Sequence, residues 1–117
     1  MPYMLLIVEP VGQREARGVE AGQAAYAQML DYTDALRGAG VLMASSALAS
    51  AATRLQQPEG AAAPRVLDGP FAEAREMIGG FFLLNCATRE AALGWAARCP
   101  AAAWATVEVR ETGPCYT

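Results

Sequence analysis

Two short segments of this 117-residue chain are apolar at consecutive positions, and they constrain the fold more than any other feature. They are residues 3–8 and residues 80–84. Successive side chains of a strand point to opposite faces of the sheet. A strand without polar positions is therefore covered on both faces, as at the centre of a sheet. We expect these two segments to be the central strands of one sheet.

The remaining elements follow from spacing and from turn residues. Small, apolar or weakly polar residues recur at intervals of three and four over residues 19–39, which predicts an amphipathic helix with Gly22, Tyr26, Met29 or Leu30, Thr33 and Leu36 on its buried face. Residues 41–44 predict a second strand, and residues 53–55 and 65–67 predict a loose hairpin. Thr88 is suited to cap a helix that ends before Pro100. Residues 104–110 alternate, which indicates a strand with one buried face.

This order is β-α-β, a hairpin, then β-α-β, the split pattern of a ferredoxin-like sandwich. We expect an α+β fold in a single domain over residues 1–117. Helices cover only one side of such a sheet, so the other side needs a second covering. A long loop or the sheet of a second subunit would serve, and we favour the second subunit.

Charge and residue usage exclude several classes of function. The net charge is −3, and the nine basic residues, all arginine, are dispersed, so we expect no nucleic-acid partner. The chain has no histidine, which removes Ser-His and Cys-His pairs and every His-containing metal site. We expect no cofactor and no metal.

Three cysteines, Cys86, Cys99 and Cys115, are odd in number and have no C-x-x-C spacing. They predict free thiols and a cytoplasmic location. The apolar run near the N-terminus, residues 4–8, is too short for a signal peptide or a membrane span. We therefore expect no membrane association.

Residues 68–76 read Asp-Gly-Pro-Phe-Ala-Glu-Ala-Arg-Glu, and Gly-Gly-Phe-Phe follows at 79–82. Together with the blocks at 3–6, 39–42, 90–100 and 107–110, this motif closely resembles the DGPF branch of the YCII-related family. The resemblance implies a homodimeric α+β barrel in which two ferredoxin-like sheets pack face to face. Some members of the family resemble small acid/base enzymes with a His-Asp pair, for which this chain has no histidine. Genes of this branch often lie beside an extracytoplasmic-function sigma factor, which implies a possible sigma-factor partner by association alone.

Asp68 is the first candidate catalytic residue. An Asp before Gly-Pro commonly closes a turn by accepting backbone N–H bonds. Alternatively, its carboxylate lies at the end of a sheet, partly desolvated by Phe71 and by the approach of Gly79 and Gly80, and acts as a general base. Both roles can hold together.

The rest of the same loop supplies candidate ligand-binding residues, Gly69, Pro70, Phe71, Glu73, Arg75 and Glu76, and Tyr26 of the first long helix joins them. If the loop forms one helical turn, Glu73 and Glu76 share a face with Arg75 beside them. Arg75 would then hold an anionic substrate while one Glu moves a proton. Solvated ion pairs in an open loop are the structural alternative, and for Tyr26 and Phe71 the alternative is core packing.

These observations lead to three hypotheses of function. In the first, a small cytoplasmic homodimer binds a small organic molecule in a pocket near the Asp68–Glu76 loop, with cofactor-free acid/base catalysis as a further step. In the second, the same dimer is a non-catalytic regulatory or interaction module. In the third, the pocket is vestigial, and the absence of histidine favours the second and third hypotheses over catalysis. The sequence leaves open whether the protein is an enzyme.

Overall fold

The computed structural model of the chain describes residues 1–71 and 73–116. Ala72, which belongs to the predicted loop, lies outside the described residues. The elements follow the predicted order, with a short helix α1 and a 3₁₀ turn η1 in addition: β1 (Tyr3–Pro10), α1 (Gln13–Arg17), α2 (Val19–Gly38), β2 (Leu42–Ala47), β3 (Thr53–Gln56), β4 (Arg65–Asp68), β5 (Glu76–Leu84), α3 (Arg89–Arg98), η1 (Pro100–Ala103) and β6 (Thr106–Glu111).

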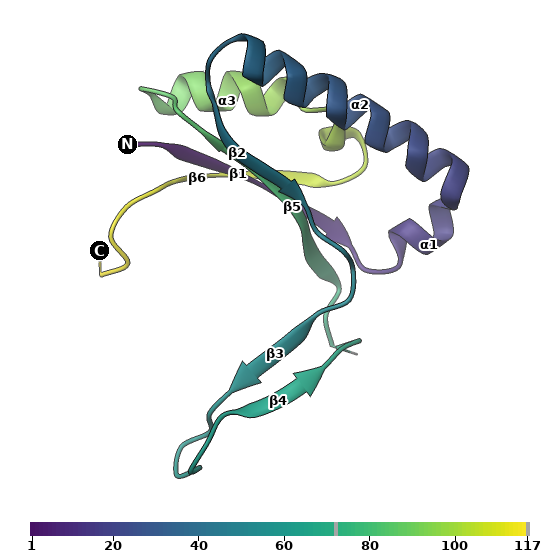
Figure 1. Cartoon of the computed structure of the whole chain (residues 1–117), viewed down its shortest axis with the longest axis vertical. Coiled ribbons are helices and arrows are strands. Elements are labelled where there is room, and N and C mark those ends of the chain that lie inside the picture. Colours follow the sequence, from purple (N-terminus) through teal and green to yellow (C-terminus); the bar gives the residue numbers. More distant parts are fainter. Residues whose placement is uncertain (72, 117) are drawn as a thin grey trace.

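The main sheet has the order β2-β5-β1-β6, and all of its neighbouring strands are antiparallel. The two segments that are apolar at consecutive positions, in β1 and β5, are central, as the sequence predicts. Helices α2 and α3 both lie on one side of this sheet (Figure 1). The architecture is the ferredoxin-like α+β arrangement.

The two faces of the sheet have different coverings. On β1, Tyr3, Leu5 and Ile7 are buried beneath the helices, whereas the alternate side chains are half-buried. Strand pairing continues this second face onto β5. We call it the open face; its apolar residues are Met4, Leu6, Val8, Ile78, Phe81 and Leu83.

The core lies between the sheet and the two long helices. Tyr32 of α2 packs edge-on against Phe82 with ring centroids 5.3 Å apart, and its hydroxyl donates a hydrogen bond to the Trp95 carbonyl at 2.6 Å. The predicted cap is confirmed, because the Ala91 N–H donates to Thr88 Oγ1 at 3.1 Å.

No helix among the described residues is long and apolar enough to cross a membrane.

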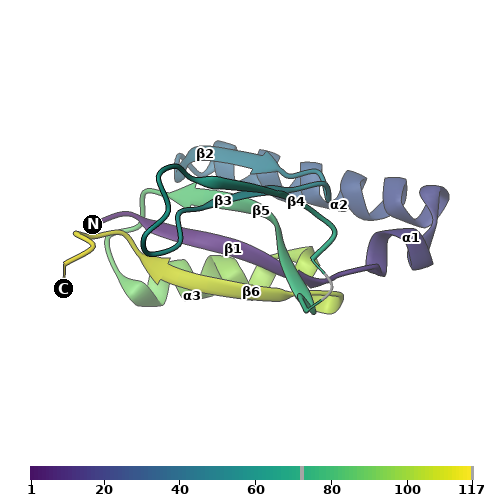
Figure 2. The ribbon, with the colours of Figure 1, turned by 90° about the horizontal axis from the view of Figure 1, so that it is seen from below.

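The hairpin β3–β4 extends away from the sheet on the side opposite the helices (Figures 1 and 2). Leu55 and Val66 face each other across it and are 65% and 60% exposed. The predicted hairpin is therefore present, but its apolar side chains Leu55 and Val66 stay largely exposed in the single chain.

Among the described residues between β4 and β5 there is no helix; the Ala74 N–H donates to the Phe71 carbonyl at 3.0 Å in a single turn. Glu76, at the end of this segment, is already the first residue of β5. Glu73 and Glu76 therefore do not share a helix face, and of the two alternatives for this stretch the open loop holds.

Candidate functional site

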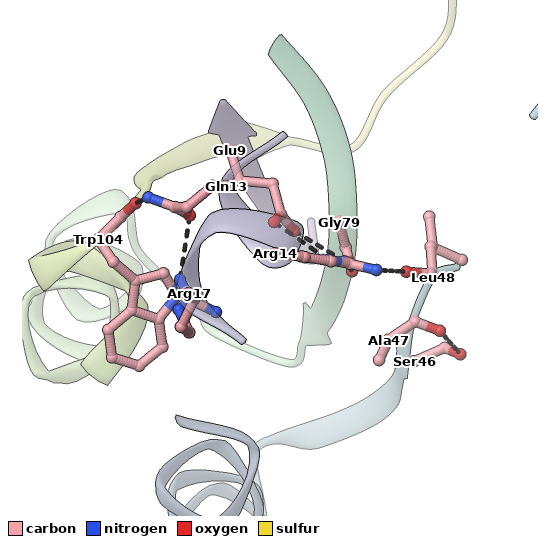
Figure 3. A network of polar contacts seen from close by, with 9 residues as sticks. All are labelled: Glu9, Gln13, Arg14, Arg17, Ser46, Ala47, Leu48, Gly79 and Trp104. Atoms are coloured by element: carbon pink, nitrogen blue, oxygen red, sulfur yellow. Dashed lines mark hydrogen bonds and ion pairs between the residues drawn. The ribbon is translucent and has the colours of Figure 1, made fainter. Parts of the chain in front are cut away.

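The helix-covered face of the sheet carries one buried charged residue among the described positions, Glu9, which is 6% exposed. It continues the alternation of Tyr3, Leu5 and Ile7 along β1. Arg14 of α1 binds it with two hydrogen bonds, from Nε to Oε2 at 3.1 Å and from Nη2 to Oε1 at 2.8 Å (Figure 3). This fork geometry fixes the carboxylate in both position and orientation.

Arg14 also connects α1 to two other parts of the fold. Its guanidinium donates to the Leu48 carbonyl at 2.7 Å and to the Gly79 carbonyl at 3.2 Å (Figure 3). Helix α1 is only five residues long, and Gly12 and Gly18 flank it with φ of 89° and 86°. Such angles suit glycine, so the chain turns sharply into and out of α1 and brings Arg14 over the end of β1.

Gly79 makes room for the carboxylate. The pairing of β1 with β5 shifts between Ile7 and Val8, so that Gly79 is a bulge residue without a direct partner on β1. A Cβ atom at this position would lie 1.6 Å from Glu9 Oε1. Glycine is therefore required here for the observed position of Glu9.

A second polar group lies on the other side of α1. The Gln13 side-chain amide donates to the Trp104 carbonyl at 2.7 Å, and Arg17 Nη2 donates to Gln13 Oε1 at 3.1 Å (Figure 3). The Arg17 guanidinium carbon lies 5.4 Å from the centroid of the Trp104 ring. These contacts hold a half-buried cation beside an aromatic ring.

Both groups open onto one cavity of about 600 Å³, which we call the helix-side cavity. Its floor is formed by β1, β2 and β5, and one wall is a face of α2 that includes Gly22, Ala25, Tyr26, Met29 and Thr33. The sequence assigned most of these α2 positions to the core. Leu36 is buried in the core as predicted, whereas Tyr32 takes the other core position of α2 and Tyr26 is 55% exposed at the cavity.

The cavity presents several groups that can bind a ligand. Each Glu9 carboxylate oxygen accepts one hydrogen bond from Arg14 and has a further lone pair. The hydroxyls of Tyr26 and Ser45 make no hydrogen bond within the described residues. Phe82 and Trp104 add aromatic surface. The cavity can therefore accept a proton or a hydrogen bond at Glu9 and enclose an apolar or planar body.

The predicted DGPF loop borders a different cavity, of about 630 Å³, which we call the loop cavity. Gly69, Pro70, Phe71 and Glu76 line it. The Arg54 guanidinium carbon lies 3.7 Å from the centroid of the Phe71 ring. The structure thus brings these four predicted residues together, at the end of the open face.

The other predicted residues are placed differently. Asp68 is exposed at the end of β4, accepts a hydrogen bond from Thr53 Oγ1 at 2.7 Å, and is outside the lining of both cavities. The predicted desolvation of Asp68 is wrong, because Gly79 packs against Glu9 and Arg14 and not against the loop.

Glu73 and Arg75 are exposed, and Glu73 makes a surface ion pair with Arg54 at 3.6 Å. Tyr26 lines the helix-side cavity, apart from the loop residues with which the sequence grouped it.

Glu9, Arg14 and Arg17 were missed by the sequence reasoning, which ended the first strand at residue 8 and assigned no element before residue 19. One signal was available, since Glu9 has the same strand phase as Tyr3, Leu5 and Ile7. Its partner Arg14 could not be found in this way, because Arg14 lies in helix α1, which the sequence did not predict. Among residues 1–71 and 73–116, no group of three or more cysteine or acidic side chains is arranged to hold a metal ion.

Comparison with curated proteins finds no match to this sequence. Among solved structures, the fold is similar to that of 5-chloro-2-hydroxyhydroquinone dehydrochlorinase from Burkholderia phenoliruptrix, in complex with 2,5-dihydroxybenzoquinone. The TM-score is 0.54 at 15% sequence identity, and the alignment covers 97% of this chain and 94% of the other. The sequence profile of the YCII-related domain matches residues 1–114, and the chain therefore belongs to the YCII-related family.

Proposed function

We propose that this protein binds a small organic molecule in the helix-side cavity, with Glu9 as the polar anchor. The observation that carries the proposal is a buried carboxylate, fixed by Arg14, that lines a cavity of about 600 Å³. Small-molecule sites are concave and combine apolar walls with a few well-placed polar groups that orient the ligand. Here Met29, Phe82 and Trp104 supply apolar surface beside Glu9 and Arg14. A compound with a hydroxyl group on a ring, the class to which 2,5-dihydroxybenzoquinone belongs, would donate to Glu9 and pack its ring on the aromatic walls.

The loop cavity is the weaker candidate for this ligand. Val8 and Ile78, which line it, belong to the open face. A second copy packed on that face would approach the loop cavity, whereas the helix-side cavity lies on the opposite side of the sheet. Glu76 is the acidic residue in the lining of the loop cavity, and it is exposed.

Proton transfer is the chemistry that Glu9 would add to binding. A ligand hydroxyl that donates to Glu9 could pass its proton to the carboxylate and recover it later, without a cofactor. Glu9→Gln keeps the size of the side chain but cannot act as a base. We expect this variant to lose any turnover of a bound compound.

The open face supports a homodimer as part of the proposal. Six apolar side chains lie on it, and the hairpin β3–β4 extends on the same side. A second copy of this sheet would remove these side chains from water.

The odd number of cysteines, with Cys86 and Cys99 buried as free thiols, fits a reducing cytoplasm. A sigma-factor partner stays a prediction of the family resemblance.

The binding proposal is tested with two neighbouring positions on α2. Ala25 lines the helix-side cavity, whereas the adjacent Ala24 is exposed and outside its lining. Ala25→Trp would fill the cavity, and Ala24→Trp is the matched control with the same added side chain.

A thermal-shift screen of hydroxylated ring compounds, beginning with 2,5-dihydroxybenzoquinone, should find ligands that stabilise the wild type and Ala24→Trp. Stabilisation follows RT ln(1 + [L]/Kd), about 2.7 kcal/mol at 100-fold excess over Kd. Ala25→Trp should lose this effect. Equal stabilisation of the two tryptophan variants by every active compound would place the ligand elsewhere and overturn the proposal.

A further inference from the structure

The charges around the helix-side cavity define its ligand more narrowly. Four charged side chains line it, Glu9, Arg14, Arg17 and Arg37. The whole chain has a net charge of −3, so this local excess of arginine is not a consequence of a basic protein. The question is which of the three arginines has a charge that the protein does not neutralise.

Two of them have carboxylate partners. Arg14 is paired with Glu9 at 2.8 Å, and most of its donors are used on Glu9, Leu48 and Gly79. Arg37 is paired with Asp34 at 2.8 Å, three residues before it on the exposed surface of α2. Neither of these guanidinium groups needs a further anion.

Arg17 differs from both. Among the described residues it makes no ion pair with a carboxylate, and its hydrogen-bond acceptor is the neutral Gln13 amide oxygen. A guanidinium has five N–H donors, so most donors of Arg17 remain available. The side chain is half-buried and held against Trp104. A partly desolvated cation that is already oriented is suited to bind an anion, because removing it from water without a partner is costly.

We infer that the ligand of the helix-side cavity is a small organic acid whose carboxylate binds Arg17. This inference rests on the proposed function and adds the charge class of the ligand. The planar fork of arginine matches a carboxylate with two parallel hydrogen bonds. The apolar body then packs on Met29, Phe82 and Trp104, and a hydroxyl group on that body donates to Glu9.

The test compares acids with their neutral amides, which have nearly the same shape. Suitable pairs are benzoate with benzamide, 4-hydroxybenzoate with 4-hydroxybenzamide, and 2-naphthoate with 2-naphthamide. Binding to the wild type by isothermal titration calorimetry should favour the acid of a pair by about tenfold or more, as expected for a charge-assisted bidentate contact. The preference should decrease as ionic strength rises.

Arg17→Gln should remove the preference while the amide binds as before. Arg17→Lys keeps the charge but loses the fork, so it should retain part of the preference. Arg65→Gln, which removes an exposed arginine outside the lining of the cavity, is the matched control and should behave as the wild type. Thermal unfolding of each variant without ligand separates loss of binding from loss of the fold.

The outcomes distinguish the inference from the proposal on which it rests. If amides bind as tightly as acids and Ala25→Trp abolishes both, the cavity is a ligand site but the charge inference is wrong. An acid preference that survives Arg17→Gln would equally overturn the role of Arg17. If no member of either series binds, or if Ala25→Trp leaves all binding unchanged, the proposed function fails together with the inference.

Discussion

Gly79→Ala should destabilise the protein by displacing Glu9 from Arg14. The added methyl would lie 1.6 Å from Glu9 Oε1 and 2.8 Å from Arg14 Nη2, far inside van der Waals contact. The Glu9 side chain must then move, and it loses two charge-assisted hydrogen bonds. The backbone is not obstructed, because the three nearest atoms all belong to the side chains of Glu9 and Arg14.

The magnitude follows from the burial of the pair. Breaking a fully buried ion pair costs about 3–5 kcal/mol. The Arg14 side chain is 33% exposed and that of Glu9 is 7% exposed, so solvent screens part of this loss. Replacing glycine in a strand also returns up to about 1 kcal/mol. We therefore expect the free energy of unfolding to fall by about 2–3 kcal/mol.

Urea denaturation measures this difference, and two further variants show its cause. Gly94→Ala on α3 adds a methyl with no neighbour within 4 Å, so it should leave stability unchanged or raise it by up to about 1 kcal/mol. In a Glu9→Ala background the second substitution Gly79→Ala should cost less than about 0.5 kcal/mol, because the clashing carboxylate is absent. If Gly79→Ala is as stable as the wild type, or costs the same with and without Glu9, the assignment of Gly79 as the space for Glu9 is refuted.

Three other predictions test the assembly, the loop and the core. Leu6→Asp on the open face should leave a folded protein that sediments as a monomer, whereas Leu5→Asp in the core should not fold; a Leu6→Asp dimer would contradict the proposed interface. Asp68→Asn should cost less than about 1 kcal/mol and leave ligand affinity unchanged, because Asp68 accepts one hydrogen bond on an exposed hairpin; lost affinity would return it to the site. Burial raises the pKa of Cys99 and of Tyr32, so the folded state keeps both protons to higher pH than the unfolded chain. Their contribution to stability is complete below the unfolded pKa values, about 8.5 and 10, and is lost as the pH rises through the folded ones. The thermal midpoint should fall above about pH 9, and less steeply in Cys99→Ala; an unchanged slope would contradict this.

The central sheet could be predicted from the sequence because a strand buried on both faces has apolar residues at consecutive positions. Residues 3–8 and 80–84 have no alternation to interpret, and the structure pairs them as the two inner strands. The hairpin β3–β4 could also be predicted from the sequence, because turn residues separate its two strands. The length of β5 was underestimated, because Glu76 and Met77 precede the apolar run.

The helix-side cavity was not predictable in the same way, for a physical reason visible on α2. A helix face that lines a cavity has much the same periodicity as one that packs in a core. The register of Gly22, Tyr26 and Thr33 was therefore interpreted as a buried face, with Tyr26 also named as a candidate ligand-binding residue, although Tyr32 occupies the core position. The two cases differ in whether side chains of other elements pack against that face, which the spacing of residues within α2 does not reveal.

The segment that follows the DGPF motif is joined to the connection between β1 and α1 by a backbone hydrogen bond, in which Asp68 takes no part. Its downstream end leads into β5, and the Arg75 carbonyl accepts a hydrogen bond from the Val11 N–H at 2.9 Å. That bond fixes the chain between β1 and α1, the connection that brings Arg14 over Glu9. Because a strand alternates its side chains, Val8 then faces the loop cavity while Glu9, the next residue, faces the helix-side cavity. The motif residues Gly69, Pro70 and Phe71 therefore border the loop cavity, whereas Glu9 lies on the other face of the sheet, where the bulge at Gly79 provides the space for its carboxylate.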